Sequence, residues 1–224
     1  MTSHLYWLGG SPCAGKSSMA ALLAQTYDLR VYAVDEALPR QLAQLTPAMQ
    51  PVLYKWTHTP WDALWMQPPA VLLDEAIAAY REHCRLVVAE IGAEAATLRP
   101  VLVEGTCLLP ECVAPHLPAR PMGTRHWARH GLWVVPTPAF QRDHYPRRGP
   151  FVQSILDQCR DPDQALTNWM DRDVAFGRWV AAEATQRGYR VLVVDGSRTL
   201  ADYAAQVADH FGWRAEHHEE SHVA

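Results

Sequence analysis

Lysine is nearly absent from this chain: among its 224 residues only Lys16 and Lys55 are lysines, and the other basic residues are arginines. The chain also lacks an excess of positive charge, because 20 lysine and arginine residues against 24 acidic ones give a net charge of −4. Proteins that bind nucleic acid or anionic membranes through their overall charge are usually basic. We therefore expect neither partner. The position of Lys16 is informative, since the chain uses lysine so rarely.

The sequence also has few cysteines and no long hydrophobic run. Its five cysteines are odd in number and widely spaced, without a Cys-x-x-Cys pair. Neither a disulfide framework nor a zinc site is expected, and a reducing compartment is favoured. No run of about 18 apolar residues predicts a membrane span, and the N-terminus has no charged-then-apolar leader. The sequence thus predicts a globular, cytoplasmic protein.

The length fits one domain that carries movable segments. We expect a single domain over residues 1–213, with a substrate flap at about 37–67 and a lid at about 137–160. These two proline-bearing regions fit neither a strand nor a sheet-covering helix. The polar residues 214–224 are predicted to form a flexible tail.

Short apolar runs alternate with helical patterns along the chain, which is typical of a parallel sheet covered on both faces. Strands are predicted at 4–8, 30–34, 101–103, 132–135 and 190–194. Helices are predicted at 16–26, from the Pro68-Pro69 pair to about Leu98, from Asp161 as N-cap to Gly188, and from a cap at Ser197 or Thr199 to Gly212. The strands end at Gly10, Asp35, Glu104, Pro136 and Asp195. In open α/β sheets ligands bind at such carboxyl ends, so these residues should converge.

Residues 10–17, Gly-Ser-Pro-Cys-Ala-Gly-Lys-Ser, match the pattern G-x-x-x-x-G-K-[ST] at every fixed position. The context is right as well, because an apolar strand precedes the motif and a helical pattern follows it. Small residues let backbone N–H groups curl around a phosphate, and the following helix directs its positive end toward it. Lys16 would lie between β- and γ-phosphates and Ser17 would offer a hydroxyl to Mg²⁺. Pro12 lacks an N–H and cannot donate.

This motif and the five-strand layout resemble the P-loop kinases of the nucleoside monophosphate kinase-like group. The resemblance implies a three-layer P-loop NTPase fold with sheet order 2-3-1-4-5, and it implies ATP and Mg²⁺ as cofactors. It also implies nucleotide contacts from Gly10, Ser11, Cys13, Ala14, Gly15, Lys16, Ser17 and Ser18. An Asn-Lys-x-Asp motif, which reads guanine in GTPases, is absent from the sequence.

Two acidic residues at strand ends are candidates for the chemistry. Transfer of a phosphoryl group to a hydroxyl releases a proton, which a positioned carboxylate accepts. The segment around Asp35 resembles chloramphenicol phosphotransferase, and an Asp follows this strand in shikimate kinase too. Asp35 can equally cap the next helix. Glu104, in Val-Glu-Gly-Thr, is at the position of a Walker B acid. Whether it binds the metal or the substrate is left open.

Arginines after the fourth strand are candidates for the charge that spreads over the transferring phosphate. In kinases of this group the lid supplies them, and here it contains Arg142, Arg147 and Arg148. Arg142 is the first choice because it is nearest the strand end, and Arg172 and Arg178 lie on the next helix. Gly196 and Ser197, after the fifth strand, resemble the loop that passes the adenine base.

The flap contains aromatic residues and a few polar ones, a composition that suits a mostly apolar small-molecule pocket. Trp61 and His58 are candidate substrate contacts, whereas Trp65 is assigned to core packing. Arg40 opens the segment, and in monophosphate kinases an arginine near this position binds the acceptor phosphate.

These observations predict an ATP-dependent phosphotransferase that acts on a hydroxyl of a small molecule. Lys16, Asp35, Glu104 and Arg142 would be catalytic, and Ser17 and Glu104 would hold the metal. Asp35, Arg40, His58, Trp61 and Glu104 would contact the acceptor. Two alternatives remain open at this point: a nucleoside monophosphate kinase, which would need Arg40 but no base, and a nucleotide-binding regulator without transfer activity.

Overall fold

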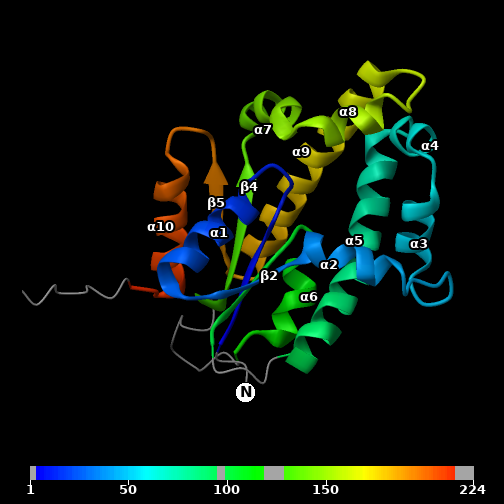
Figure 1. The fold of residues 1–224 in the computed structure, drawn as a ribbon. Helices are drawn as coiled ribbons and strands as arrows, with labels where there is room; N and C mark the ends of the chain where they lie inside the picture. The colour runs from blue at the N-terminus through cyan, green and yellow to red at the C-terminus, as the bar shows by residue number, and fades with distance from the viewer. Residues whose placement is uncertain (1–3, 95–98, 119–128, 215–224) are drawn as a thin grey trace, which may run out of the picture.

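The computed structural model describes residues 4–94, 99–118 and 129–214, so the predicted tail, apart from Arg214, lies outside the described residues. Five strands form one parallel sheet in the order β2-β3-β1-β4-β5 (Figure 1). The strands are β1 (Leu5–Gly10), β2 (Arg30–Ala33), β3 (Val101–Glu104), β4 (Gly131–Pro136) and β5 (Arg190–Val194). Both the α/β class and the strand order agree with the expectation from the sequence.

Helices cover both faces of the sheet (Figure 1). On one face lie α1 (Lys16–Tyr27) and α10 (Leu200–Phe211), and on the other lie α5 (Pro69–Glu94), α6 (Pro110–Val113) and α9 (Pro162–Gln186). The two faces follow from the period of two in a strand. In β4, Trp133 and Val135 pack toward α9, whereas Leu132 and Val134 pack toward α1 and α10.

The predicted flap and lid are built from short helices. The flap region holds α2 (Val34–Leu42), α3 (Pro51–His58) and α4 (Trp61–Trp65), and the lid region holds α7 (Pro138–His144), η3 (Tyr145–Arg148) and α8 (Pro150–Leu156). A further short turn, η1 (Ala114–His116), follows α6. Parts of α4, α8 and the first turns of α5 and α9 share a third hydrophobic core, in which Trp65 stacks on Trp169 with ring centroids 4.1 Å apart.

The caps explain where the long helices begin. Asp161 accepts a hydrogen bond from the N–H of Gln164 at 3.0 Å, as predicted for α9. The side chain of Gln164 does not return to the cap, because it donates to Asn168 instead. Thr199 and Asp202 form a capping box at α10, so the cap is Thr199 and not Ser197.

One glycine explains how the loop after β1 is attached to the sheet. Gly10 has a φ of 126°, and a Cβ added there would lie 1.9 Å from the carbonyl oxygen of Val134 in β4. Only glycine permits this approach, so the loop leaves the sheet in direct backbone contact with its neighbouring strand. Ser11 continues the contact through an N–H bond to the same carbonyl.

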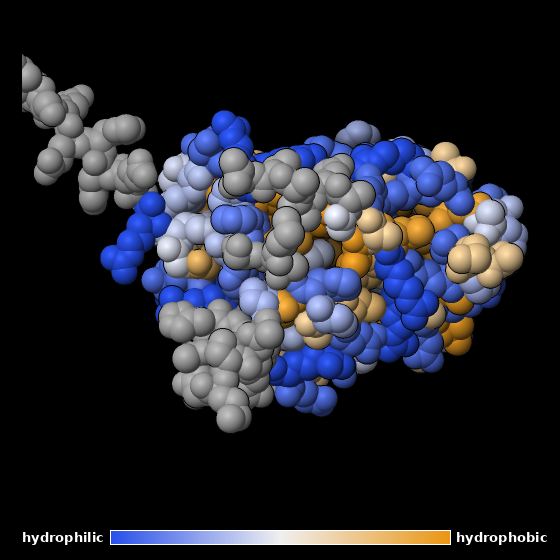
Figure 2. All heavy atoms as spheres, turned by 90° about the horizontal axis from the view of Figure 1, so that it is seen from below, coloured by the Kyte–Doolittle hydropathy of each residue, from blue (hydrophilic) through white to orange (hydrophobic). Residues whose placement is uncertain are grey.

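The opposite end of the molecule from the strand tips, seen from below, is mainly hydrophilic (Figure 2). Hydrophobic residues appear there toward the side of α3, α4 and α5. No helix in the described part of the chain is long and apolar enough to span a bilayer.

Candidate active site

A cleft of about 1180 Å³ opens at the carboxyl ends of the strands. The tips of β1, β2 and β3 meet there, because Leu8 and Ala33 both pair in register with Glu104. Gly105 brings β3 close to the start of α2: a Cβ on it would lie 2.6 Å from Cβ of Val34. This close approach places Asp35, Glu104 and the loop after β1 around one cavity, as the strand ends predicted.

The loop after β1 presents an uncapped helix start to the cleft. Gly15 is the N-cap of α1, in the left-handed conformation, and no side chain caps it. The first N–H groups of an α-helix have no acceptor within the helix. Cys13, with a φ of 63°, makes the turn that precedes them. These donors and the positive end of the helix dipole make the loop a site for an anion.

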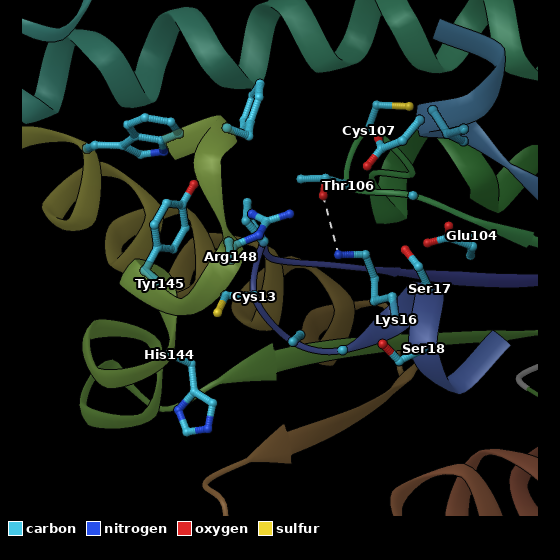
Figure 3. Close-up of a pocket in the computed structure, with 18 of the residues that line it drawn as sticks. Cys13, Lys16, Ser17, Ser18, Glu104, Thr106, Cys107, His144, Tyr145 and Arg148 are labelled. Carbon is cyan, nitrogen blue, oxygen red and sulfur yellow. Dashed lines mark hydrogen bonds between the residues drawn. The ribbon is translucent and has the colours of Figure 1, made fainter. Parts of the chain in front are cut away.

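Lys16 is 7% exposed, and its ammonium group lies inside the loop. Its Nζ donates to the carbonyl oxygen of Ser11 at 2.8 Å and to Oγ1 of Thr106 at 3.3 Å (Figure 3). Burial lowers the pKa of Lys16, and the charges of Glu104 and Asp35 oppose that effect. A buried cation held by neutral oxygens is prepared to pair with a phosphate.

Glu104 lies beside the first turn of α1 and is 2% exposed. Burial raises its pKa, while the charge of Lys16 and a hydrogen bond from the Ser17 hydroxyl act in the opposite direction. Figure 3 shows the Ser17 and Glu104 oxygens directed toward each other. A hydroxyl from the Lys-Ser motif beside a carboxylate at a strand end is the arrangement expected of a Mg²⁺ site.

Among the predicted residues, most line the cleft and several do not. The lining ones are Cys13, Ala14, Gly15, Lys16, Ser17, Ser18, Asp35, Trp61, Glu104, Arg147, Arg148 and Gly196. Gly10, Ser11 and Ser197 support the loops instead, the last by donating to Asp195 at 2.6 Å. That bond, with one from Tyr203, lowers the pKa of Asp195 to about 2.

Three predicted side chains are turned elsewhere. Arg40 pairs with Glu90 of α5, and Arg142 pairs with Asp171 of α9 at 2.7 Å. His58 stacks on Tyr54, with ring centroids 3.9 Å apart. None of the three is among the described residues that line the cleft.

Arg148 is the lid arginine whose charge reaches the centre of the cleft. Its guanidinium lies 5.3 Å from the ring centroid of Tyr145, and its charge contributes to lowering the pKa of Lys16. Arg148 and Lys16 point into the same space between lid and loop (Figure 3). Arg147 also lines the cleft and pairs with Asp143 at 3.1 Å.

Arg172, which the sequence named only in passing, also lines the cleft. Arg172 is 3% exposed and pairs through Nε with the fully buried Asp173 at 2.8 Å. Its guanidinium lies 5.6 Å from the Trp56 ring centroid and 5.0 Å from that of Trp65. The sequence named Arg172 only as one of several arginines, because nothing local marks a residue on a long helix as part of a cleft.

Tyr80 and His83 are also new members of the site. They lie three residues apart on α5, so they share one face of that helix, and both line the cleft. His83 is 6% exposed, and burial lowers its pKa to about 4, with the charge of Asp35 acting in the opposite direction. At neutral pH its imidazole is therefore uncharged.

No family model matches this chain, and no curated protein matches it in sequence. Among solved structures, a "putative kinase" from Chloroflexus aurantiacus J-10-fl is similar, with 13% identity and a TM-score of 0.37. The alignment covers 94% of this chain and 99% of that chain. A likeness this weak does not bear on the function of this chain.

Proposed function

We propose that the protein is an ATP-dependent phosphotransferase that moves the γ-phosphate of ATP to a hydroxyl of a small molecule. The observation that carries the proposal is the buried Lys16 ammonium, which lies inside an uncapped loop and faces a cleft. A cation and a set of free N–H donors at one point suit the β- and γ-phosphates of a nucleotide. Phe140, Gly196 and Arg198 line the adjoining part of the cleft, where the base would lie.

The residues present fit a Mg²⁺ ion that is bound with the nucleotide. Ser17 and Glu104 would hold it, because their oxygens already lie together at the loop. Within the described ranges no group of three or more potential metal ligands occurs. This agrees with Mg²⁺, which commonly takes one or two protein ligands and completes its shell with phosphate oxygens and water. When bound, Mg²⁺ would neutralise charge on the phosphates.

Asp35 supports a hydroxyl as the acceptor. It is exposed to the cleft, and the N-cap of α2 is Ala33, so Asp35 is not needed as the cap. In the proposed step the acceptor oxygen bonds to the γ-phosphorus, the bond from that phosphorus to the β–γ bridging oxygen breaks, and Asp35 takes the hydroxyl proton. Arg148 would neutralise charge on the transferring group.

The nucleoside monophosphate kinase alternative is less well supported. It relies on Arg40 to bind an acceptor phosphate, but Arg40 pairs with Glu90 away from the cleft lining. The negative charges of Asp35 and Glu104 also disfavour a second phosphate near them.

The two lysines of the chain provide a matched test of nucleotide binding. Lys16→Ala should weaken binding of a fluorescent ATP analogue by about 10- to 100-fold, because a charge-assisted contact is lost. Lys55→Ala should leave the affinity unchanged, since Lys55 is exposed and pairs with Glu75. Equal affinities of Lys16→Ala and the wild-type chain would refute the proposal.

Asp35→Asn tests the transfer step. The variant should bind the ATP analogue normally but should turn over about 10²- to 10⁴-fold more slowly with an accepted alcohol. Arg40→Ala should retain activity. Full activity of Asp35→Asn with loss of activity in Arg40→Ala would favour a phosphate acceptor, and ATP binding without ADP release with any acceptor would favour a regulator.

A further inference from the structure

The half of the cleft beyond Asp35 forms a slot with apolar walls. Leu42 from α2, Leu53 and Trp56 from α3, and Tyr80 and His83 from α5 are among the residues that line it. Trp56 meets Tyr80 edge to face, with ring centroids 5.8 Å apart. A wall of this kind favours a ligand with an apolar ring, because contact between aromatic rings contributes binding free energy through buried apolar area and through favourable ring–ring geometry.

Arg172, a basic side chain at this slot, already has an acidic partner. Arg172 pairs with the buried Asp173 at 2.8 Å, and it is packed against the rings of Trp56 and Trp65. An anion in the slot would have to compete with Asp173 for the Arg172 guanidinium and would lose its hydration. The slot is suited to an uncharged molecule.

A hydrogen-bond network sets the proton position on His83. The amide nitrogen of Gln41 donates to a carboxylate oxygen of Glu90 at 2.7 Å. Because a carboxylate accepts only, the amide oxygen of Gln41 faces His83, at 2.7 Å from its Nε2. His83 must then carry its proton on Nε2, and Nδ1 keeps a lone pair.

Nδ1 of His83 has no hydrogen-bond partner within the described part of the chain. His83 is 6% exposed and lines the slot, so this lone pair is what the side chain presents to a bound molecule. Nδ1 is not one of the fully buried atoms without a partner, so it remains accessible from the cleft and can accept a hydrogen bond from a ligand donor.

We propose that the slot binds an uncharged alcohol with an apolar ring, and that Nδ1 of His83 accepts a hydrogen bond from a second donor group of that molecule. The proposal rests on the proposed phosphotransferase function for the role of the alcohol, but the slot and its preference can be measured without transfer. His83 would thus determine which alcohols bind well.

Four probes separate the parts of the proposal: naphthalen-2-ylmethanol, 6-(hydroxymethyl)naphthalen-2-ol, the phosphate ester of the first, and ribose. Their dissociation constants are measured by calorimetry on the full chain, with and without a non-hydrolysable ATP analogue and Mg²⁺. We expect the naphthol to bind about five- to tenfold more tightly than the compound without the second hydroxyl. The phosphate ester and ribose should bind at least about tenfold more weakly than either alcohol.

His83→Phe should abolish the preference for the naphthol while it keeps the affinity for naphthalen-2-ylmethanol, and His116→Phe, outside the cleft lining, should change neither. If His83→Phe does not fold, nitrogen-15 NMR of the wild-type imidazole should show an unprotonated Nδ1 whose signal moves when the naphthol is added. A preference that persists in His83→Phe, a protonated Nδ1, tight binding of the phosphate ester, or no binding of either alcohol would overturn the proposal. Loss of nucleotide binding with retained naphthol preference would instead refute the proposed function alone.

Discussion

Burial shifts the pKa values of two ionisable residues at the cleft in opposite directions. Burial lowers the pKa of Lys16 and raises that of Glu104, and each charge counteracts the shift of the other. A bound phosphate would raise the pKa of Lys16 and so favour its charged form, and a bound cation would lower the pKa of Glu104 and favour its charged form.

His83 leads to a prediction about stability and pH. Its pKa is about 4 in the folded chain, below the ordinary value of 6.5, because burial disfavours the charged imidazole. Between pH 6.5 and 4 the unfolded chain therefore binds a proton that the folded chain does not, so the free energy of unfolding falls as the pH is lowered through that window. The loss attributable to His83 is up to about 3 kcal/mol.

Urea denaturation of the wild-type chain and of His83→Phe between pH 7 and 4 measures this contribution. The wild-type chain should lose more stability than the variant as the pH is lowered. Parallel curves for wild type and His83→Phe would show that the imidazole does not stay neutral in the folded state.

At the scale of elements, the lid presents its arginines in different directions. Arg142 is on α7 and pairs with Asp171, whereas Arg148 ends η3 and lines the cleft. Arg142 was the first choice from the sequence, because of the three lid arginines it is nearest along the chain to the end of β4. The turn from α7 into η3 decides instead which guanidinium is directed inward.

We predict that Arg148→Ala lowers the turnover number by about 10²- to 10³-fold, because a charge aimed at the transferring phosphate is removed. Arg142→Ala should change it by less than about twofold, since its partner Asp171 is half-exposed and such pairs contribute little. Steady-state kinetics with ATP and an accepted alcohol compare the two. A larger loss in Arg142→Ala would mean that the lid rearranges when the nucleotide binds.

At the scale of the whole molecule, three cores hold the chain together: one on each face of the sheet and a third under the flap and lid. The third core joins segments from both sides of the cleft, since α4 and α8 pack on α9 there. We propose that residues 1–213 behave as one domain, because the first two cores share the sheet, and the first and third cores share α9.

The C-terminal boundary of that domain can be tested. Trp213 packs on Tyr6 and Phe211, each with ring centroids 4.8 Å away. Trp213→Ala should reduce the free energy of unfolding by about 2 kcal/mol, because aromatic contacts and half-buried area are lost. Deletion of residues 215–224 should leave it unchanged. Thermal unfolding followed by circular dichroism measures both, and destabilisation by the deletion would place the boundary further along the chain.

Much of the fold follows from local sequence signals. Each strand was predicted within about two residues, because an apolar run that ends in glycine, proline or an acid is short-range information. The starts of α9 at Pro162 and of α10 at Leu200 could be predicted, because the capping residues lie within one helical turn of them. The long helix α5 was expected to reach Leu98, but its observed end at Glu94 precedes residues outside the described part of the chain.

The loop from Gly10 to Ser17, the parallel sheet and the meeting of Asp35 with Glu104 at the strand tips were determined by the sequence itself. Backbone torsions, strand periodicity and the single direction of parallel strands depend on neighbours a few residues apart. Only the tertiary structure decided that Arg40 and Arg142 pair away from the cleft, that Arg172 pairs with Asp173, and that His83 presents Nδ1 to a slot. Those outcomes depend on which hydrogen-bonding or charged group of a neighbouring helix lies within about 3 Å of each side chain. That distance is set by helix packing and cannot be inferred from residues close in sequence.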